Sequence, residues 1–135
     1  MGERTARCSC GSLTATVQGE PLEVYLCTCS NCQRQSGGVS TYCAIFPETA
    51  VSIAGAQTRW RHLGVSGRWI ETAFCPTCGS TVLARIEGRP GVIGVSAGCF
   101  ADPNFAQPER VYWASQQHRW LTLPEGTQLI ATQPD

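Results

Sequence analysis

The chain has 135 residues and a mass of 14.5 kDa, with ten arginines, ten acidic residues and no lysine. Its net charge is zero and its arginines form no run or stripe, which argues against a nucleic-acid-binding surface. Without lysine the chain cannot form a Schiff base on its own side chain or build a Gly-Lys-Ser/Thr phosphate loop. This length predicts a single domain that buries roughly two-thirds of the surface exposed by its unfolded form.

Targeting signals and membrane segments are not apparent in the sequence. No apolar run approaches the roughly 18 to 20 residues of a membrane helix, and the N-terminus lacks the apolar stretch of a signal peptide. We therefore expect a cytoplasmic protein with no membrane partner. Nine cysteines are then unusual, because the cytoplasm keeps thiols reduced and an odd number cannot pair entirely into intrachain disulfides. Metal binding is the natural explanation.

Short alternating apolar stretches predict several strands along the chain. In chain order they lie at residues 13–17, 42–46, 69–74, 82–86, 92–95 and 111–113. Turn signals such as Gly19-Glu20-Pro21 separate them, and this spacing suits small antiparallel sheets. The best candidate for a helix is a turn or two at Ser30–Ser36. We therefore expect a mainly β fold with little helix.

The organisation along the chain indicates one unit. No linker and no repeat divides the sequence, so residues 1–135 are expected to form a single domain. Only residues 132–135 are expected to form a loose tail.

Seven of the nine cysteines fall into three spaced motifs, which are Cys8-x-Cys10, Cys27-x-Cys29-x-x-Cys32 and Cys75-x-x-Cys78. Cysteines separated by one or two residues can reach a single zinc ion from a tight turn, with thiolates about 2.3 Å from the metal. The only two-plus-two partition that keeps the middle motif whole joins the first motif to the last. This partition predicts a closed structural zinc site, and zinc binding at such sites contributes on the order of 10 kcal/mol to folding.

The middle motif supplies three thiolates from six residues. Three protein ligands and one open position are typical of catalytic zinc, and we expect this arrangement at Cys27, Cys29 and Cys32. The alternative is a closed site, and the sequence leaves four candidates for its fourth ligand, which are Cys43, Cys99, His62 and His118.

The remaining candidates also have simpler interpretations. Cys43 lies in an alternating apolar stretch and is expected to fill the core as a small hydrophobic residue. Cys99 follows a Gly-rich stretch, and a packing role in the core or a pocket is favoured because no histidine is near it in sequence. Trp113 and Trp120 are expected in the core rather than at a subunit interface. Both a monomer and a homodimer stay open.

The order and spacing of the three cysteine motifs resemble those of the glutathione-dependent formaldehyde-activating enzyme family, which also includes centromere protein V. The resemblance extends to the residues beside the motifs, which are Gly11, Gln33-Arg34, Phe74 and Gly79-Ser80. The similarity extends over residues 8–120. The resemblance implies a β-tent fold of small coiled antiparallel sheets, in a superfamily that also holds methionine sulfoxide reductase B. It also implies two zinc ions. One is structural and held by the outer motifs at Cys8, Cys10, Cys75 and Cys78, and the second is held by Cys27, Cys29 and Cys32.

Two positions depart from the family pattern. Thr28 stands where the family often has histidine, which removes a possible donor in the pocket without removing a metal ligand. Arg110 stands where the family usually has histidine before an apolar-aromatic pair, which is expected to alter contacts with the substrate.

The resemblance implies a carbon-sulfur lyase-type enzyme that joins glutathione and formaldehyde into S-hydroxymethylglutathione. A bound cation favours thiolate over thiol, so an open zinc suits this chemistry. Gln33 and Arg34 are expected to meet a glutathione carboxylate, although Arg34 is equally compatible with a solvated position. One alternative is a non-catalytic zinc module for a protein or small thiol. Another is a reductase in which Cys99 or Cys43 is a low-pKa nucleophile.

Overall fold

Two β-sheets and one short α-helix make up the structure, a computed structural model that describes residues 2–133. The smaller sheet is antiparallel and has the order β1-β2-β5, formed by β1 (Glu3–Arg7), β2 (Thr14–Gln18) and β5 (Val51–Ala54). The larger sheet has the order β11-β10-β3-β4-β9-β8-β7-β6. Its strands are β3 (Glu23–Cys27), β4 (Thr41–Pro47), β6 (Thr58–Leu63), β7 (Trp69–Phe74), β8 (Thr81–Ile86), β9 (Val92–Ser96), β10 (Arg110–Tyr112) and β11 (Gln128–Leu129).

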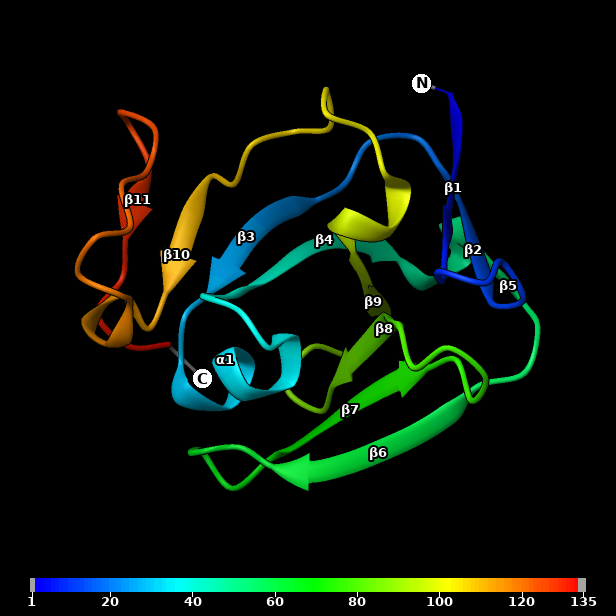
Figure 1. Cartoon of the computed structure of the whole chain (residues 1–135), viewed down its shortest axis with the longest axis horizontal. Helices are drawn as coiled ribbons and strands as arrows, with labels where there is room; N and C mark the ends of the chain where they lie inside the picture. The colour runs from blue at the N-terminus through cyan, green and yellow to red at the C-terminus, as the bar shows by residue number, and fades with distance from the viewer. Residues whose placement is uncertain (1, 134–135) are drawn as a thin grey trace.

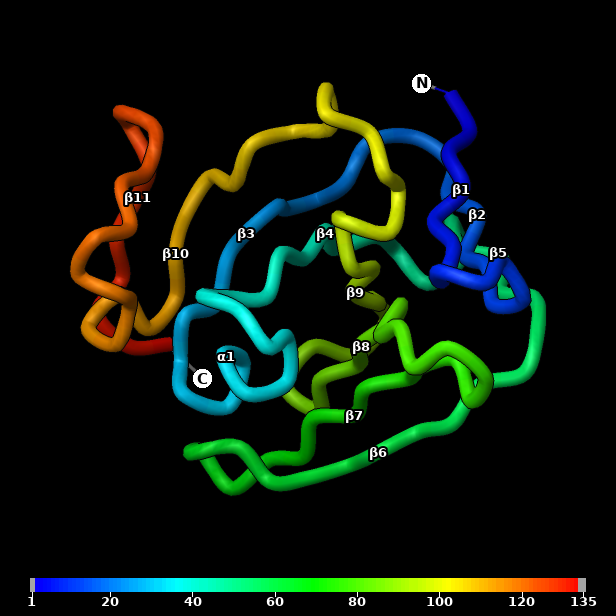
Figure 2. The backbone as a smooth tube through the Cα atoms, viewed as in Figure 1, coloured from blue at the N-terminus to red at the C-terminus, as the bar shows by residue number. Residues whose placement is uncertain are grey.

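The larger sheet curls around the helix. Figure 1 shows α1 (Ser30–Ser36) between β3 and β10 on one side and β6 and β7 on the other. The tube in Figure 2 shows the same curl, with the smaller sheet at the opposite end from β10 and β11. Because the two ends of the sheet face each other across the helix, turns that are distant in sequence come to line one space.

The helix forms where the sequence predicts it. Its N-cap is Cys29, whose Sγ accepts a hydrogen bond from the N–H of Cys32, and it ends at Gly37 in the left-handed region at φ 67°. The glycine at that position lets the chain turn back directly into the approach to β4.

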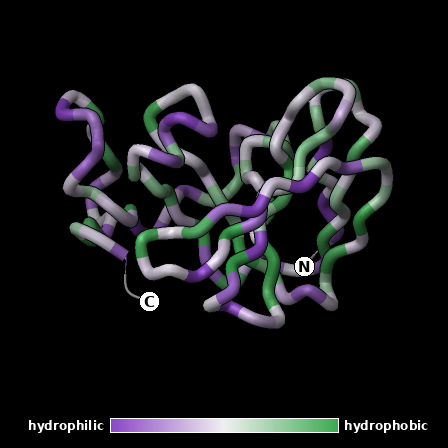
Figure 3. Tube along the Cα trace, turned by 90° about the horizontal axis from the view of Figure 1, so that it is seen from below, coloured by the Kyte–Doolittle hydropathy of each residue, from purple (hydrophilic) through white to green (hydrophobic). Residues whose placement is uncertain are grey.

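Burial follows the alternation expected for strands with one covered face. In β2 the side chains of Ala15 and Val17 are fully buried between partly exposed neighbours. In β4 four consecutive residues, 43–46, are buried, which is typical of a central strand covered on both faces. Figure 3 shows hydrophobic and hydrophilic residues alternating in short stretches along the chain. The core lies between the two sheets around Phe46.

Three further features of the fold differ from the sequence pattern or add to it. β10 runs parallel to both β3 and β11, whereas the other paired strands are antiparallel. The predicted strand at 111–113 ends at Tyr112, because Trp113 adopts a left-handed φ of 59° and begins a 3-10 turn. The core expectation for Trp120 is wrong: its side chain is 69% exposed, because the chain has left the sheet there.

The C-terminal segment returns to the end of β10, and the remaining helices are short. Residues 134 and 135 of the expected tail lie outside the described residues, and the carbonyl of Thr132 accepts a hydrogen bond from the N–H of Trp113 at 3.2 Å. Among residues 2–133, no helix has the length and apolar character needed to cross a bilayer. Short 3-10 helices occur at Glu48–Ala50, Ala97–Phe100 and Ala114–Gln116.

Candidate metal centres and the adjoining cavity

The first cysteine cluster joins the two outer motifs across the sheets. The Sγ atoms of Cys8, Cys10, Cys75 and Cys78 all lie within 4.8 Å of one another. Those of Cys8 and Cys10, and those of Cys10 and Cys75, are 3.7 Å apart. Four thiolates placed tetrahedrally at about 2.3 Å from zinc would be about 3.8 Å apart, so the sulfur positions fit a closed zinc site.

Two tight turns hold these sulfurs in place. The N–H of Leu13 donates to Sγ of Cys8 at 3.2 Å, and the N–H of Cys78 donates to Sγ of Cys75 at 3.5 Å. Gly11 and Gly79 follow the two pairs at φ values of 83° and 80°, which side chains other than glycine adopt rarely. These backbone donors support negatively charged sulfurs, as a metal site requires.

Two serine hydroxyls also favour the thiolate form. Ser80 Oγ lies 3.3 Å from Sγ of Cys78, and its hydrogen bond lowers the pKa of Cys78 to about 5. Ser12 Oγ lies 3.2 Å from Sγ of Cys75, and its hydrogen bond lowers the pKa of Cys75 to about 7. Cys75 and Cys78 are therefore set up to lose their protons to a cation.

The second cluster contains three sulfurs only. Those of Cys27, Cys29 and Cys32 lie within 4.8 Å of one another, and no other histidine, cysteine or acidic residue among residues 2–133 joins them. Three thiolates at this spacing fit three corners of a tetrahedral zinc site. A fourth position is left for a ligand that is not part of the described chain.

None of the four candidates for a fourth ligand lies with the three sulfurs of the second cluster. Cys43 is buried in β4 and packs with Cys27 and Tyr25. Cys99 donates to the carbonyl of Thr81 at 3.5 Å and packs against the core. The two histidines are also outside the cluster. His118 is exposed, and Nε2 of His62 lies 3.1 Å from Nδ2 of Asn31.

The end of β3 and the start of α1 position the three sulfurs. Cys27 closes β3, Cys29 caps the helix and Cys32 lies in its first turn. Hydrogen bonds from the thiols of Cys27 and Cys32 lower the pKa of Cys29 to about 2, and the N–H of Cys32 supports the same charge at 3.3 Å. The pKa of Cys27 is raised in turn, because its proton is shared with Cys29. The three residues thus act as one proton-sharing group.

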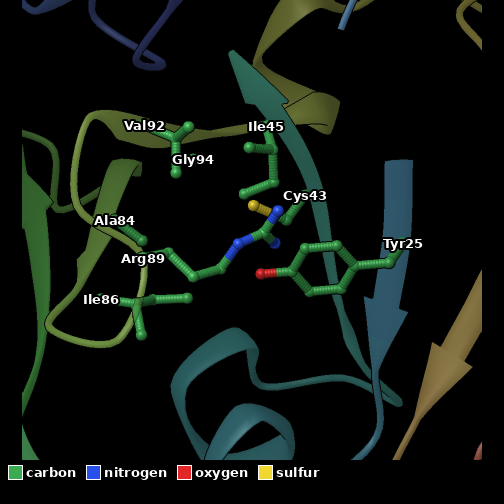
Figure 4. A pocket seen from close by; sticks show the side chains of 8 residues that line it. All are labelled: Tyr25, Cys43, Ile45, Ala84, Ile86, Arg89, Val92 and Gly94. Carbon is green, nitrogen blue, oxygen red and sulfur yellow. The ribbon is translucent and has the colours of Figure 1, made fainter. Parts of the chain in front are cut away.

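A cavity of about 630 Å³ opens next to the second cluster. Cys27, Cys29 and Cys32 line it, together with parts of β4, the turns at 63–68 and 86–89, and residues 113–116 and 132–133. This volume is within the range of small-molecule sites. A narrow recess of about 10 Å³ adjoins it and shares Tyr25, Cys43 and Arg89 with the cavity wall (Figure 4).

The expected substrate residues Gln33 and Arg34 are not part of the cavity lining. The Gln33 amide donates to the carbonyls of Thr28 and Gln116 at 2.8 and 2.9 Å, which ties the helix to the segment after β10. Arg34 is exposed on the helix. Their expected contact with a carboxylate thus finds no support in the geometry.

The two departures from the family pattern are also outside the cavity. Thr28 is fully buried and donates to the carbonyl of Trp113 at 2.8 Å, so it fixes the end of β10. Arg110 pairs with the buried carboxylate of Glu23 rather than facing the cavity. The expected change in substrate contacts therefore does not arise directly from Arg110.

The sequence did not single out Arg68 and Arg89, the two charged residues that line the cavity. Both lie in Gly-containing turns, at 64–68 and 88–91, that the pattern marks only as connections. No sequence signal indicated that these turns face the cysteine motif, because the curl of the sheet brings them there.

Comparison with known proteins agrees with this cysteine arrangement. The sequence profile described as "Glutathione-dependent formaldehyde-activating enzyme" matches residues 3–116, which include both cysteine clusters. The chain belongs to the glutathione-dependent formaldehyde-activating enzyme family. No curated protein matches the sequence.

A solved structure supports the fold of this family member. The crystal structure of a Rhodobacter sphaeroides protein, a structural-genomics target, is similar with a TM-score of 0.56 and 22% sequence identity. The similarity covers 70% of this chain and 85% of that protein. At this identity the likeness concerns the arrangement of the strands and not the chemistry.

Proposed function

We propose that this chain catalyses the addition of a small thiol, glutathione or a close analogue, to formaldehyde or a related small aldehyde. The observation that carries the proposal is the cluster of Cys27, Cys29 and Cys32, which has no fourth protein ligand among the described residues and faces a cavity. Family membership agrees with this reaction class, that of carbon-sulfur lyases.

The three thiolates would hold a zinc ion. Zinc at this position would favour the thiolate form of a thiol that enters the fourth coordination site at neutral pH. The sulfur then bonds to the carbonyl carbon, and the π electron pair of the carbonyl moves to its oxygen. The thiol proton ends on that oxygen, so the product is an S-hydroxymethyl thioether (a hemithioacetal) and no oxidant or reductant is needed.

We assign the transfer of that proton to Nε2 of His62, the imidazole in the cavity wall, because its Nδ1 is buried without a hydrogen-bond partner in the described chain. Nε2 lies 3.1 Å from Nδ2 of Asn31, in the turn that carries the cysteines, and would exchange this hydrogen bond for the reacting oxygen. Stacking on Trp60 at a centroid distance of 4.3 Å fixes the plane of the ring. Imidazole is the side chain best suited to proton exchange near neutral pH.

The experiment compares metal content and exchange kinetics. Elemental analysis of the zinc-replete protein should give two zinc ions per chain, falling to about one in Cys29→Ser. The matched control Cys43→Ser alters a thiol of the same cavity that is not part of the cluster, and it should keep two. Exchange of ¹³C-formaldehyde with glutathione, measured by NMR, should be faster with wild type than in buffer. Two bound zinc ions without any acceleration would contradict the proposal.

A reductase mechanism finds no support in the two remaining cysteines. Burial raises the pKa of the Cys43 thiol to about 12. Burial also raises the pKa of Cys99. Neither thiol has the lowered pKa that a nucleophilic cysteine needs at neutral pH. The open position at the second cluster likewise favours catalysis over a closed binding module.

A further inference from the structure

Two arginines face the cavity that the second cysteine cluster opens into. Arg68 lies in the turn between β6 and β7, and Arg89 lies in the turn between β8 and β9. The residues that line this cavity include no aspartate or glutamate. The charged groups of this part of the wall are therefore two guanidinium groups, and Arg89 shares the carboxylate of Glu23, behind the wall, with Arg110.

Arg89 is held in position from behind the cavity. Its Nη1 donates to Oε1 of Glu23 at 2.9 Å, and Glu23 itself is only 6% exposed. Figure 4 shows the Arg89 guanidinium beside the Cys43 thiol and the Tyr25 hydroxyl at the adjoining recess. Tyr25 and Cys43 pack in one cluster with Cys27. Arg89 thus lies beside two side chains that pack against Cys27 of the second cluster.

Arg68 lies against the turn that carries Arg89. A Cβ atom added at Gly88 would come within 2.8 Å of Nη1 of Arg68, so the guanidinium covers the glycine next to Arg89. In the described part of the chain Arg68 makes no ion pair. The absence of a side chain at Gly88 therefore leaves room for the Arg68 guanidinium on the turn that carries Arg89.

A cavity wall with two guanidinium groups and no acid favours an anionic ligand. We propose that Arg68 and Arg89 form an anion subsite that binds a carboxylate of the thiol substrate. This inference rests on the proposed function and assigns the residues that would recognise its substrate: two arginines outside the cysteine motifs that bind a carboxylate of the thiol. The volume of about 630 Å³ accommodates a peptide-sized thiol that spans from the cysteines to the arginines.

The test measures binding to the zinc-loaded full chain by isothermal titration calorimetry. The ligands are glutathione, its diethyl ester and S-methylglutathione, which keeps both carboxylates and has no free thiol. Because a charged hydrogen bond is lost, the diester should bind about 10-fold more weakly than glutathione. Arg68→Gln and Arg89→Gln should each weaken glutathione and S-methylglutathione by about 10-fold and leave the diester within 2-fold.

Arg34→Gln is the matched control, because Arg34 is an exposed arginine outside the cavity. It should bind all three ligands as wild type does. Arg68 is exposed and unpaired within the described chain, so Arg68→Gln tests the subsite even where Arg89→Gln fails to fold. Equal affinity for glutathione and diester, or an equal loss in Arg34→Gln and Arg68→Gln, would overturn the subsite.

The failure of the subsite and that of the proposed function give different results. Adduct formation without any preference for carboxylates overturns the subsite and leaves the function intact. Carboxylate-dependent binding of S-methylglutathione that is lost in Arg68→Gln supports the subsite, even where no exchange of formaldehyde is accelerated.

Discussion

A single buried carboxylate organises the region between the cavity and the parallel strands. Glu23 accepts hydrogen bonds from Arg89, Arg110 and Tyr112, of which the Tyr112 hydroxyl lies at 2.7 Å. Burial alone raises the pKa of Glu23, but these three donors outweigh it and hold the pKa below its usual value. A buried charge is tolerated here because every part of it is paired.

Glu23→Gln should destabilise the protein by on the order of 3 kcal/mol at pH 7, because two guanidinium groups lose their anionic partner. The folded-state pKa of Glu23 lies below the unfolded one, so its contribution is present above the unfolded value. It is lost as the pH falls through the folded value. Urea denaturation at neutral and acid pH should therefore show the difference between wild type and variant shrinking with acid.

The control for this prediction is Glu20→Gln. Glu20 pairs with Arg4 at the surface, 3.4 Å away, and exposed pairs contribute little. Its change in the free energy of unfolding should stay below about 1 kcal/mol. The prediction is wrong if Glu23→Gln lowers the free energy of unfolding no more than Glu20→Gln does, or if its effect does not vary with pH. The Glu23 carboxylate would then not be the charge that organises this region.

His62 offers a second prediction at the scale of one residue. His62→Gln keeps a side chain that can hydrogen-bond to Asn31 but cannot carry the proton, so kcat should fall about 100-fold. Glutathione affinity should stay within 2-fold. Steady-state kinetics and calorimetry separate the two effects. A parallel loss of affinity would indicate that His62 shapes the cavity rather than transferring a proton.

At the scale of elements, one glycine positions a turn of the first cysteine cluster. Gly55 follows β5 at φ 101°, and a Cβ there would lie 1.9 Å from the carbonyl oxygen of Ser12. The hydroxyl of the same serine lies 3.2 Å from the sulfurs of Cys10 and Cys75. The close approach of β5 therefore sets where the Cys8-Cys10 turn sits.

Gly55→Ala should cost roughly 2–4 kcal/mol, because the clash involves backbone that cannot rotate away and the φ angle is strained. Zinc affinity at the first site should fall while the second site keeps its zinc. Gly19→Ala is the matched control: its φ is 79° but nothing lies within 4 Å, so only roughly 1 kcal/mol is expected. Thermal unfolding and competition with a chelator measure both effects, and equal behaviour of the two variants would contradict the argument.

How far the sequence predicts these elements depends on whether the signal is local. Ser30–Ser36 was predictable as a helix because the run begins within the cysteine motif and is followed by Gly37, which ends it. β6 was missed because five of its six residues are exposed, which leaves no alternation of apolar residues. The parallel pairing of β10 with β3 was missed because it depends on a connection of more than 80 residues rather than on a turn.

At the scale of the whole molecule, the two cysteine clusters have different positions in the chain. The first joins the turn between β1 and β2 to the turn between β7 and β8, and so connects the two sheets. The second uses three residues within one segment. The cysteine partition was predictable because few combinations were possible. The cavity was not, because the neighbouring hairpins that carry His62, Arg68 and Arg89 meet the cysteine motif only through the curl of the sheet.

This difference predicts how each site contributes to stability. Cys10 and Cys75 are 65 residues apart in sequence, so a metal that joins them restricts a long loop of the unfolded chain. Cys10→Ser should therefore lower Tm by more than about 10 °C, since structural zinc contributes an amount comparable to the whole stability of a small domain. Cys29→Ser should change Tm by only a few degrees, because its cluster closes no long loop.

Differential scanning calorimetry with excess zinc measures both variants, and a chelator provides the complementary experiment. Wild type with chelator should reproduce the low Tm of Cys10→Ser, because both lose the same connection between the sheets. Cys29→Ser with chelator should unfold at that same low temperature, because the chelator removes the metal from the first cluster, which this variant leaves intact. If Cys29→Ser alone lowered Tm as far as Cys10→Ser does, the second cluster would also be a structural site, and an open catalytic position there would lose its physical basis.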